Sequence, residues 1–439
     1  MTFISFNPAT GRQNGRFEAL DADQLERRLQ QSAEAAEGWR HRPFAERAAL
    51  LNQVAAQLSA NRERLALCIT REMGKLLSES LAEVDRCARE CAYFAAHGQA
   101  MLPLARSPVT FEPLGVVLLL GSWHFPLWQL FRVLAPTLMA GNAVLLKLAD
   151  NLPGCAREIA ALMEAAQVPA GLVTSLAIDQ ARVAELIRDP RVSGLAFGGN
   201  REDGARLAAL AGQQLKKVEL ELDEAELHLV LDDADLEAAV DAVLLARLGN
   251  AGQQGIEARG LVVTPAIADD FVALLAARLA EWRPGHPEEL GSRLAPLACG
   301  RQREALHRQL AAAVDEGARL VAGGTLPEGD GWYYPASLLD GVSPDMAVFR
   351  RPLPGPLAAV VRVRNEEDIV SLCRGLGPDG TARIWTRELA RGEQLARRLP
   401  FDRCLVNPDP GRTYPPGMAA EEHFNIKAFC RMRSLRISV

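Results

Sequence analysis

The stretch from Leu114 to Leu146 decides the fold. It reads, in order, VVLLL (116–120), PLWQLFRVLAPTLMAG (126–141) and AVLLK (143–147). Its length is enough for a membrane span of about 20 residues, but Pro126, Arg132 and Pro136 interrupt it. The pattern therefore predicts a strand, a helix and a second strand. Continuous apolar runs are typical of strands that are buried on both faces of a parallel sheet.

Helical and strand-like segments alternate on both sides of this stretch. Between Asp21 and about Met101, apolar residues three and four apart predict two or three long amphipathic helices. After the second strand, the same alternation predicts a doubly wound α/β domain that ends near Leu222. A second α/β region follows, in which REALHRQLAAAVDEGARLV (303–321) is expected to be one long helix. The final segment, FCRMRSLRISV (429–439), is expected to be an edge strand.

The composition narrows the class of protein. Of 439 residues, 49% are hydrophobic and 24% are charged, which is typical of a compact globular chain and excludes fibrous and largely disordered classes. The formal net charge of −6 argues against nucleic acid as a partner, so a small molecule is the expected ligand. The eight cysteines show no metal-ligand or disulfide-framework spacing, and no secretory signal is visible. We therefore expect no bound metal, no membrane partner and a cytoplasmic location.

One glycine motif matches the dinucleotide-binding fingerprint but stands in the wrong context. Gly375-Leu-Gly-Pro-Asp-Gly380 follows a helix-like segment and precedes a strand-like one, whereas the fingerprint requires the opposite order. We therefore expect only a turn there. The sequence contains no phosphate-binding P-loop and no serine-hydrolase elbow.

Short strings in a fixed order are spread over nearly the whole chain. They are FNPATGR (6–12), ITREMGK (69–75), EPLGVVLLLGSWHFPLWQ (112–129), AGNAVLLK (140–147), FGGN (197–200), LKKVELEL (215–222), LDDADLEAAV (231–240), NAGQQG (250–255), WYYPASLL (332–339) and HFNIKAFC (423–430). In these strings the chain resembles the aldehyde dehydrogenase superfamily, specifically its succinate-semialdehyde dehydrogenase-like branch. Their number, order and spacing argue against chance agreement.

The resemblance implies an aldehyde dehydrogenase-like α/β fold with three parts. These are a doubly wound dinucleotide-binding domain (1–101 and 114–222), a second α/β catalytic-type domain (223–425) and a small β oligomerisation arm (102–113 and 426–439). The segment ARSPVTFEP (105–113) is shorter than the hairpin expected in the arm, which favours a homodimer over a tetramer.

The resemblance also implies that a cysteine thiolate attacks an aldehyde, that hydride leaves to NAD or NADP, and that a glutamate activates water to hydrolyse the thioester. Glu221 lies at the position of this general base, although a strand-end surface acid has the same sequence pattern. Gly255 occupies the position of the nucleophilic cysteine and has no side chain to form the adduct. His124 replaces the asparagine that helps to hold the oxyanion.

Further positions on the nicotinamide side depart from the family pattern. Asp223 and Glu224 replace two glycines that normally follow the base. Pro352 stands where family members carry a glutamate that binds the nicotinamide ribose. The glycine-rich segment before the C-terminal strand is shortened to YPPGMAAEE (414–422).

The adenosine side departs less from the family pattern, although Asn200 replaces the usual serine. Lys147 matches the lysine that bonds the adenosine ribose, and Asp150 is placed to accept from ribose hydroxyls, which favours NAD over NADP. Trp123 shapes the floor of the cleft, and Gly199 and Asn200 precede a helix N-terminus beside the pyrophosphate site. A helix cap and a strand-end lysine need no ligand, so a purely structural role stays open.

Two functions of different class follow. Because nucleophile, oxyanion donor and nicotinamide-ribose residue are all changed, we predict a catalytically degenerate member of the family, retained for binding, assembly or regulation. The alternative is an active NAD(P)-dependent oxidoreductase, or an enzyme with altered chemistry in which Glu221 and His124 activate water or abstract a proton.

Overall fold

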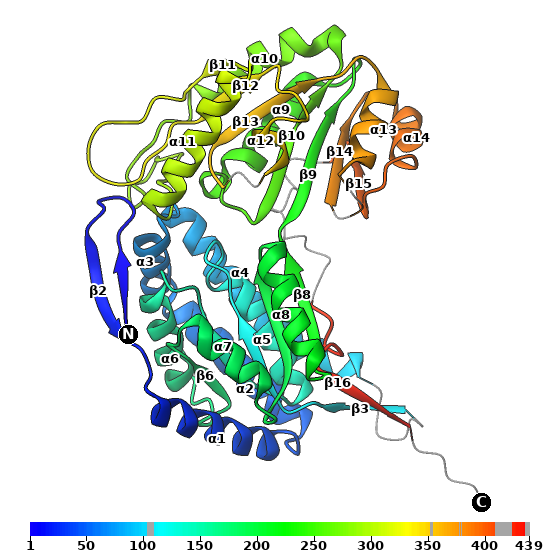
Figure 1. The fold of residues 1–439 in the computed structure, drawn as a ribbon. Helices are drawn as coiled ribbons and strands as arrows, with labels where there is room; N and C mark the ends of the chain where they lie inside the picture. Colours follow the sequence, from blue (N-terminus) through cyan, green and yellow to red (C-terminus); the bar gives the residue numbers. More distant parts are fainter. Residues whose placement is uncertain (103–108, 352–353, 377, 379, 409–423, 435–439) are drawn as a thin grey trace, which may run out of the picture.

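The computed structural model describes residues 1–439 apart from 103–108, 352–353, 377, 379, 409–423 and 435–439. Two mostly parallel sheets form the cores of two α/β domains, which lie one above the other in Figure 1. The chain passes from the first sheet to the second between β8 (Lys217–Leu222) and β9 (Glu224–Val230). This arrangement confirms the predicted α/β fold.

The first sheet contains five parallel strands in the order β6-β5-β4-β7-β8. Besides β8, these are β4 (Val116–Leu120), β5 (Ala143–Lys147), β6 (Val173–Ser175) and β7 (Val192–Gly199). The predicted strand, helix and strand are β4, α5 (Trp128–Ala140) and β5, and every residue of the two strands is buried. Strand β4 has β5 on one side and β7 on the other, so the winding direction reverses there. In open α/β sheets, ligands bind beyond the carboxyl ends of the strands at such a point.

Within the described residues, the N-terminal domain has seven α-helices besides α5. They are α1 (Ala22–Trp39), α2 (Phe44–Ala60), α3 (Arg62–Met73), α4 (Leu77–His97), α6 (Pro153–Ala165), α7 (Gln180–Arg188) and α8 (Arg201–Gln213). The expectation of two or three helices before Met101 was wrong, because α1 to α4 are four. Pro43 precedes α2, and Gly74 ends α3 with a φ of +86° that favours glycine, so local chain breaks divide a continuous helical pattern.

The second sheet has the strand order β11-β12-β13-β10-β9-β14-β15. Its strands are β9, β10 (Ile256–Val263), β11 (Arg319–Ala322), β12 (Ser337–Asp340), β13 (Leu357–Arg362), β14 (Gly380–Trp385) and β15 (Arg403–Val406). Its helices are α9 (Leu236–Leu248), α10 (Pro265–Leu279), α11 (Gly300–Asp315), α12 (Ala347–Arg350), α13 (Glu366–Arg374) and α14 (Leu389–Ala396). The predicted helix over 303–321 is too long: α11 ends at Asp315, Gly317 has a φ of +106°, and the remainder forms β11.

Strand β9 was not expected, although it lies near the centre of the second sheet. Its sequence alternates apolar and charged residues, yet Glu226 and His228 are both buried. The side chains of β14 explain this, because Arg383 pairs with Glu226 and Trp385 Nε1 donates to His228 Nδ1 at 3.3 Å. Burial alone would raise the pKa of Glu226, but the hydrogen bond from His228 and the charge of Arg383 lower it to about 2.

Two small antiparallel ribbons complete the fold. Strands β1 (Thr2–Phe6) and β2 (Gln13–Glu18) form a hairpin, and β3 (Val109–Pro113) pairs with β16 (Cys430–Ser434) at the edge of the molecule in Figure 1. The expected C-terminal strand is thus present up to Ser434, while a role of this ribbon in a homodimer stays a prediction. The Gly375–Gly380 motif joins α13 to β14, in the helix-to-strand order expected of a turn. None of the described helices is both long and apolar enough to cross a membrane.

Candidate functional site

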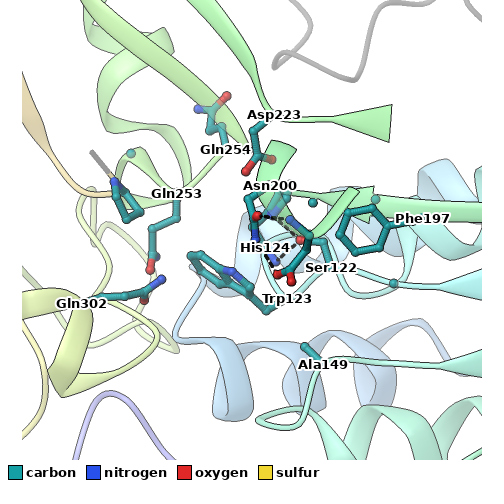
Figure 2. Close-up of a pocket in the computed structure, with 17 residues that line it drawn as sticks. Ser122, Trp123, His124, Ala149, Phe197, Asn200, Asp223, Gln253, Gln254 and Gln302 are labelled. Carbon is teal, nitrogen blue, oxygen red and sulfur yellow. Dashed lines mark hydrogen bonds between the residues drawn. The ribbon is translucent and has the colours of Figure 1, made fainter. Parts of the chain in front are cut away.

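A cleft of about 330 Å³ lies beyond the carboxyl ends of β4 and β7, where residues of both domains meet (Figure 2). It is lined by 121–124, Ala149, 197–200, Asp203, Asp223, 252–255, Gln302 and Pro354. Trp123, His124, Gly199, Asn200 and Gly255, all predicted as site residues, are therefore brought together. The position of the cleft agrees with the reversal of winding at β4.

His124 fills the space next to Gly255. A Cβ atom built on Gly255 would lie only 2.6 Å from Cε1 and 2.9 Å from Cδ2 of the imidazole, closer than real Cβ contacts allow. Gly255 also has a φ of +68°, a conformation that favours glycine. The imidazole thus occupies the place that any side chain at position 255 would need.

The hydrogen bonds of His124 determine which ring nitrogen carries the proton. Ser122 N donates to Gln129 Oε1 at 3.3 Å, so the other end of this amide, Nε2, donates to His124 Nε2 at 3.1 Å. The proton of the neutral ring is therefore on Nδ1, which donates to Ser122 Oγ. In this arrangement His124 Nε2 has no hydrogen to offer an oxyanion, and Nδ1 cannot take a proton from Ser122.

Burial keeps this imidazole neutral. His124 is 4% exposed, and burial, with a smaller contribution from the charge of Lys75, lowers its pKa to about 3. Lys75 Nζ lies 3.8 Å from the centre of the Phe125 ring and donates to Glu83 Oε2 at 2.6 Å. Glu83 Oε1 in turn accepts from the backbone N–H groups of Leu127 and Trp128 at the start of α5. A buried ion pair thus supports the loop that carries His124.

The loop that carries Gly255 is tied to the same support. Asn250 and Ala251 both have a φ of +51°, and Asn250 N donates to Glu79 Oε1 at 2.7 Å. Asn250 Nδ2 donates to the carbonyl oxygen of His124 at 3.1 Å, which links the two loops directly. Lys75, Glu79 and Glu83 were not predicted as site residues. The only sequence signal was the rarity of lysine in an arginine-rich chain.

Glu221, the residue at the general-base position, is not among the residues that line the cleft. Its Oε1 lies 3.2 Å from Nη1 of Arg132 on α5, and both side chains are mostly buried. Asp223 does line the cleft, as its position in the sequence suggested, whereas Glu224 begins β9 and does not. The predicted effects of Pro352 and of the shortened segment 414–422 fall on residues outside the described part of the chain.

A second pocket, of about 250 Å³, shares Ala149 with the cleft and contains Lys147 and Asp150. Lys147 Nζ donates to Asp150 Oδ1 at 2.7 Å and to the carbonyl oxygen of Leu148 at 3.1 Å. The guanidinium-bearing side chains of Arg28 and Arg157 line the same pocket. This pocket therefore places cationic side chains and a half-exposed carboxylate beside an open volume.

The start of α8 lies on the wall of the cleft. Asn200 caps this helix, because its Oδ1 accepts from Asp203 N at 2.9 Å. The N–H groups at a helix N-terminus attract phosphate, and the pyrophosphate site expected here stays a prediction. Asp203 lines the cleft as well, and bonds from Asn200 and Arg206 lower its pKa, so its negative charge stands beside that site.

Comparison with known proteins places these features in context. Residues 1–416 match the aldehyde dehydrogenase family. The succinate semialdehyde dehydrogenase [NAD(P)+] of Escherichia coli (strain K12) is 35% identical over 98% of this chain and 97% of its own. The succinate-semialdehyde dehydrogenase [NADP(+)] of Deinococcus radiodurans is 35% identical over 96% of this chain and 89% of its own. The succinic semialdehyde dehydrogenase of Streptococcus pyogenes, solved with NADP+, is 27% identical with a TM-score of 0.91 over 99% of both chains.

Proposed function

The chain belongs to the aldehyde dehydrogenase family, and from this premise we propose that it is a catalytically degenerate member, retained for binding, assembly or regulation. The family reaction requires a nucleophile that forms a covalent adduct with the aldehyde. The nucleophile position of this chain is Gly255, and none of the described residues that line the cleft is a cysteine.

The single observation that carries the proposal is the packing of His124 against Gly255. If only the sulfur had been lost, the cleft would contain an empty volume where the cysteine belongs. Instead the imidazole takes this volume, holds two hydrogen bonds through its ring and is neutral. The same residue also removes the oxyanion donor, so one side chain supports the loss of two catalytic functions.

Binding of a nicotinamide dinucleotide is the ligand function that the remaining residues fit best. The pocket around Lys147 and Asp150 suits an adenosine ribose, and the capped N-terminus of α8 suits a pyrophosphate. When bound, such a cofactor supplies a hydride acceptor. Asp150 favours NAD, while Arg28 and Arg157 in the same pocket offer charges that suit the extra phosphate of NADP.

The alternative, altered chemistry by Glu221 and His124, has less support from the geometry. Glu221 is paired with Arg132 and does not line the cleft. Both ring nitrogens of His124 are engaged by its neighbours, and its lowered pKa makes it a poor base near neutral pH.

The proposal is tested by assaying the purified chain with succinate semialdehyde and with a simple aldehyde, using NAD and NADP in turn. Loss of the nucleophile from the serine protease subtilisin lowers its rate by about a millionfold, so no turnover should be detectable here. Oxidation at about one turnover per second would overturn the proposal.

Two restored variants show where the activity was lost. Gly255→Cys alone should stay silent, because His124 leaves no room for the thiol. Gly255→Cys with His124→Asn should gain oxidation if the rest of the site is intact. If neither variant oxidises the aldehyde, the changes at Asp223, Glu224 or Pro352 also contribute to the loss of activity. Dinucleotide binding is measured separately, without turnover, from the rise in unfolding temperature as NAD or NADP is added.

A further inference from the structure

Two cysteines that are far apart in the sequence meet between α3 and α6, next in sequence to residues that line the pocket of Lys147 and Asp150, called here the Lys147 pocket. Cys68 on α3 and Cys155 on α6 have their Sγ atoms 3.7 Å apart. Nothing in their sequence spacing predicts this contact, since α3 and α6 come from different parts of the first domain. A disulfide has a sulfur–sulfur length of about 2.05 Å, so the observed contact needs only a small approach to become a bond.

The helices on which the two cysteines lie are held together on either side of the contact. Glu72, one turn after Cys68 on α3, accepts from the backbone N–H groups of Gly154 and Cys155 at 2.8 and 2.7 Å. On the other side, Arg64 of α3 lies 2.7 Å from Glu158 of α6. These bonds keep the two sulfurs close without any covalent link.

The two thiols differ in their access to solvent. Cys68 is partly exposed, whereas Cys155 is completely buried. Hydrogen bonding to Cys68, together with burial, raises the pKa of the Cys155 thiol well above its ordinary value. A soluble oxidant therefore reaches Cys68 first, and Cys155 is the neighbour that reacts second.

We propose that Cys68 and Cys155 form a redox-sensitive pair that hydrogen peroxide converts to a disulfide. The Cys68 thiolate attacks the peroxide, an S–O bond forms as the O–O bond breaks, and water is released after protonation. The Cys155 sulfur then attacks the Cys68 sulfenic sulfur, so the S–S bond forms and the S–O bond breaks. The thiol proton leaves with the hydroxide as a second water, and the two sulfurs are oxidised as the peroxide is reduced.

A metal ion is the competing use of this site. The ligand atoms of Cys68, Glu72 and Cys155 lie within 4.8 Å of one another, so the three residues form a possible metal-binding group. However, both carboxylate oxygens of Glu72 already accept backbone N–H groups. A structural zinc site needs four ligands, so a disulfide fits the pair better than a metal does.

The disulfide would join the wall of the Lys147 pocket to α3. Leu152, Pro153, Ala156 and Arg157, which surround Cys155 in sequence, line this pocket. The bond also closes a long loop of the chain, so it restricts the unfolded state and should raise the thermal midpoint.

The full chain is treated with a small excess of hydrogen peroxide, capped with iodoacetamide and analysed by peptide mass spectrometry. The expected product is one peptide pair linked through Cys68 and Cys155, two hydrogens lighter than the reduced pair and reversed by dithiothreitol. The oxidised chain should unfold at a higher temperature. Cys68→Ser and Cys155→Ser should each abolish the link and the thermal shift, whereas Cys87→Ala, at a buried cysteine on α4, should retain both.

Two results would overturn the proposal. In the first, the wild-type chain yields no linked peptide, and Cys68 either stays reduced or is oxidised to sulfinic acid. The other is tight binding of Zn²⁺ that protects both thiols from peroxide and is lost in both serine variants, because this would identify a metal site.

Discussion

The Lys147 pocket and the region around His124 differ in how the chain fills them. We call them the adenosine half and the catalytic half, after the roles proposed above. In the adenosine half, Lys147 is paired with Asp150, whose side chain is 56% exposed beside an open pocket. In the catalytic half, Lys75 is paired with Glu83 and both are completely buried beneath the loop that carries His124. The first ion pair thus presents a half-exposed carboxylate to a pocket, whereas the second is enclosed by protein beneath the cleft.

This difference bears on the proposed loss of the nucleophile. A large-to-small substitution in a packed site normally leaves a destabilising cavity. Here the imidazole of His124 fills the space beside Gly255, and its ring nitrogens are matched by Ser122 and Gln129. The two halves therefore respond differently to substitution, pH and ligand, as the following predictions state.

The largest expected difference concerns the two ion pairs. Glu83→Ala leaves Lys75 as an unpaired buried charge and frees two N–H groups of α5, so it should lower the free energy of unfolding by about 3–5 kcal/mol. Asp150→Ala removes a carboxylate that is 56% exposed, while Lys147, whose side chain is 9% exposed, still donates to the carbonyl oxygen of Leu148, so the cost should be only about 1 kcal/mol. Urea unfolding of both variants measures the contrast. Equal losses would mean that the two halves are packed alike.

The next effect is a pH dependence carried by His124. Its pKa is about 3 in the folded chain and about 6.5 in the unfolded chain, so the unfolded state takes up the proton first. Stability is therefore lost as the pH falls below 6.5, by about 2 kcal/mol between pH 6.5 and 4.5. Other titrating groups contribute equally in the wild type and in His124→Asn. The variant should therefore lose about 2 kcal/mol less of its free energy of unfolding over this pH range. Urea unfolding of both proteins at pH 6.5 and 4.5 measures this difference. If both lose the same free energy of unfolding, the low pKa of His124 is contradicted.

A smaller effect tests the contact between positions 124 and 255. Gly255→Ala should destabilise the chain through overpacking and a strained φ. In a His124→Ala background the overpacking is relieved while the strain remains. The double-mutant cycle should therefore give a coupling free energy of about 1.5 kcal/mol. Additive effects would show that the imidazole does not occupy this space in solution.

The smallest effect concerns the adenosine half. Lys147→Ala should weaken binding of a nicotinamide dinucleotide by about threefold to tenfold, at most about 1.4 kcal/mol. Because the Lys147 side chain is mostly buried, the free chain should also lose some stability, which the unfolding midpoint without ligand measures. Thermal unfolding with increasing NAD or NADP reports both quantities. Asp203→Asn is a useful companion, since removal of its charge beside the N-terminus of α8 should strengthen binding.

Much of the fold could be predicted because its signals are local. The apolar runs of β4 and β5 and the helical period of α5 lie in one short stretch, and the structure has them where the pattern placed them. Strand β9 escaped prediction because Glu226 and His228 look exposed in the sequence. They are buried only because Arg383 and Trp385 of β14 lie beside them.

The sequence likewise predicted some residues of the candidate site and not others. Motif positions alone predict that His124, Gly255 and Asn200 belong to one site, and the cleft contains all three. The direction of Glu221 could not be predicted, since its Arg132 partner belongs to another element. The supporting acids Glu79 and Glu83 were missed because the sequence does not distinguish a buried glutamate on a helix from an exposed one.

The sequence by itself determined the alternation of strands and helices, the family resemblance and the absence of a thiol at position 255. These properties depend on residue identity and on short-range periodicity, which can be read without coordinates. Only the tertiary structure decided that the imidazole of His124 fills the place of the missing side chain and that Cys68 meets Cys155. Such contacts join segments that are distant in the chain, and packing in three dimensions alone determines which side chains share a volume.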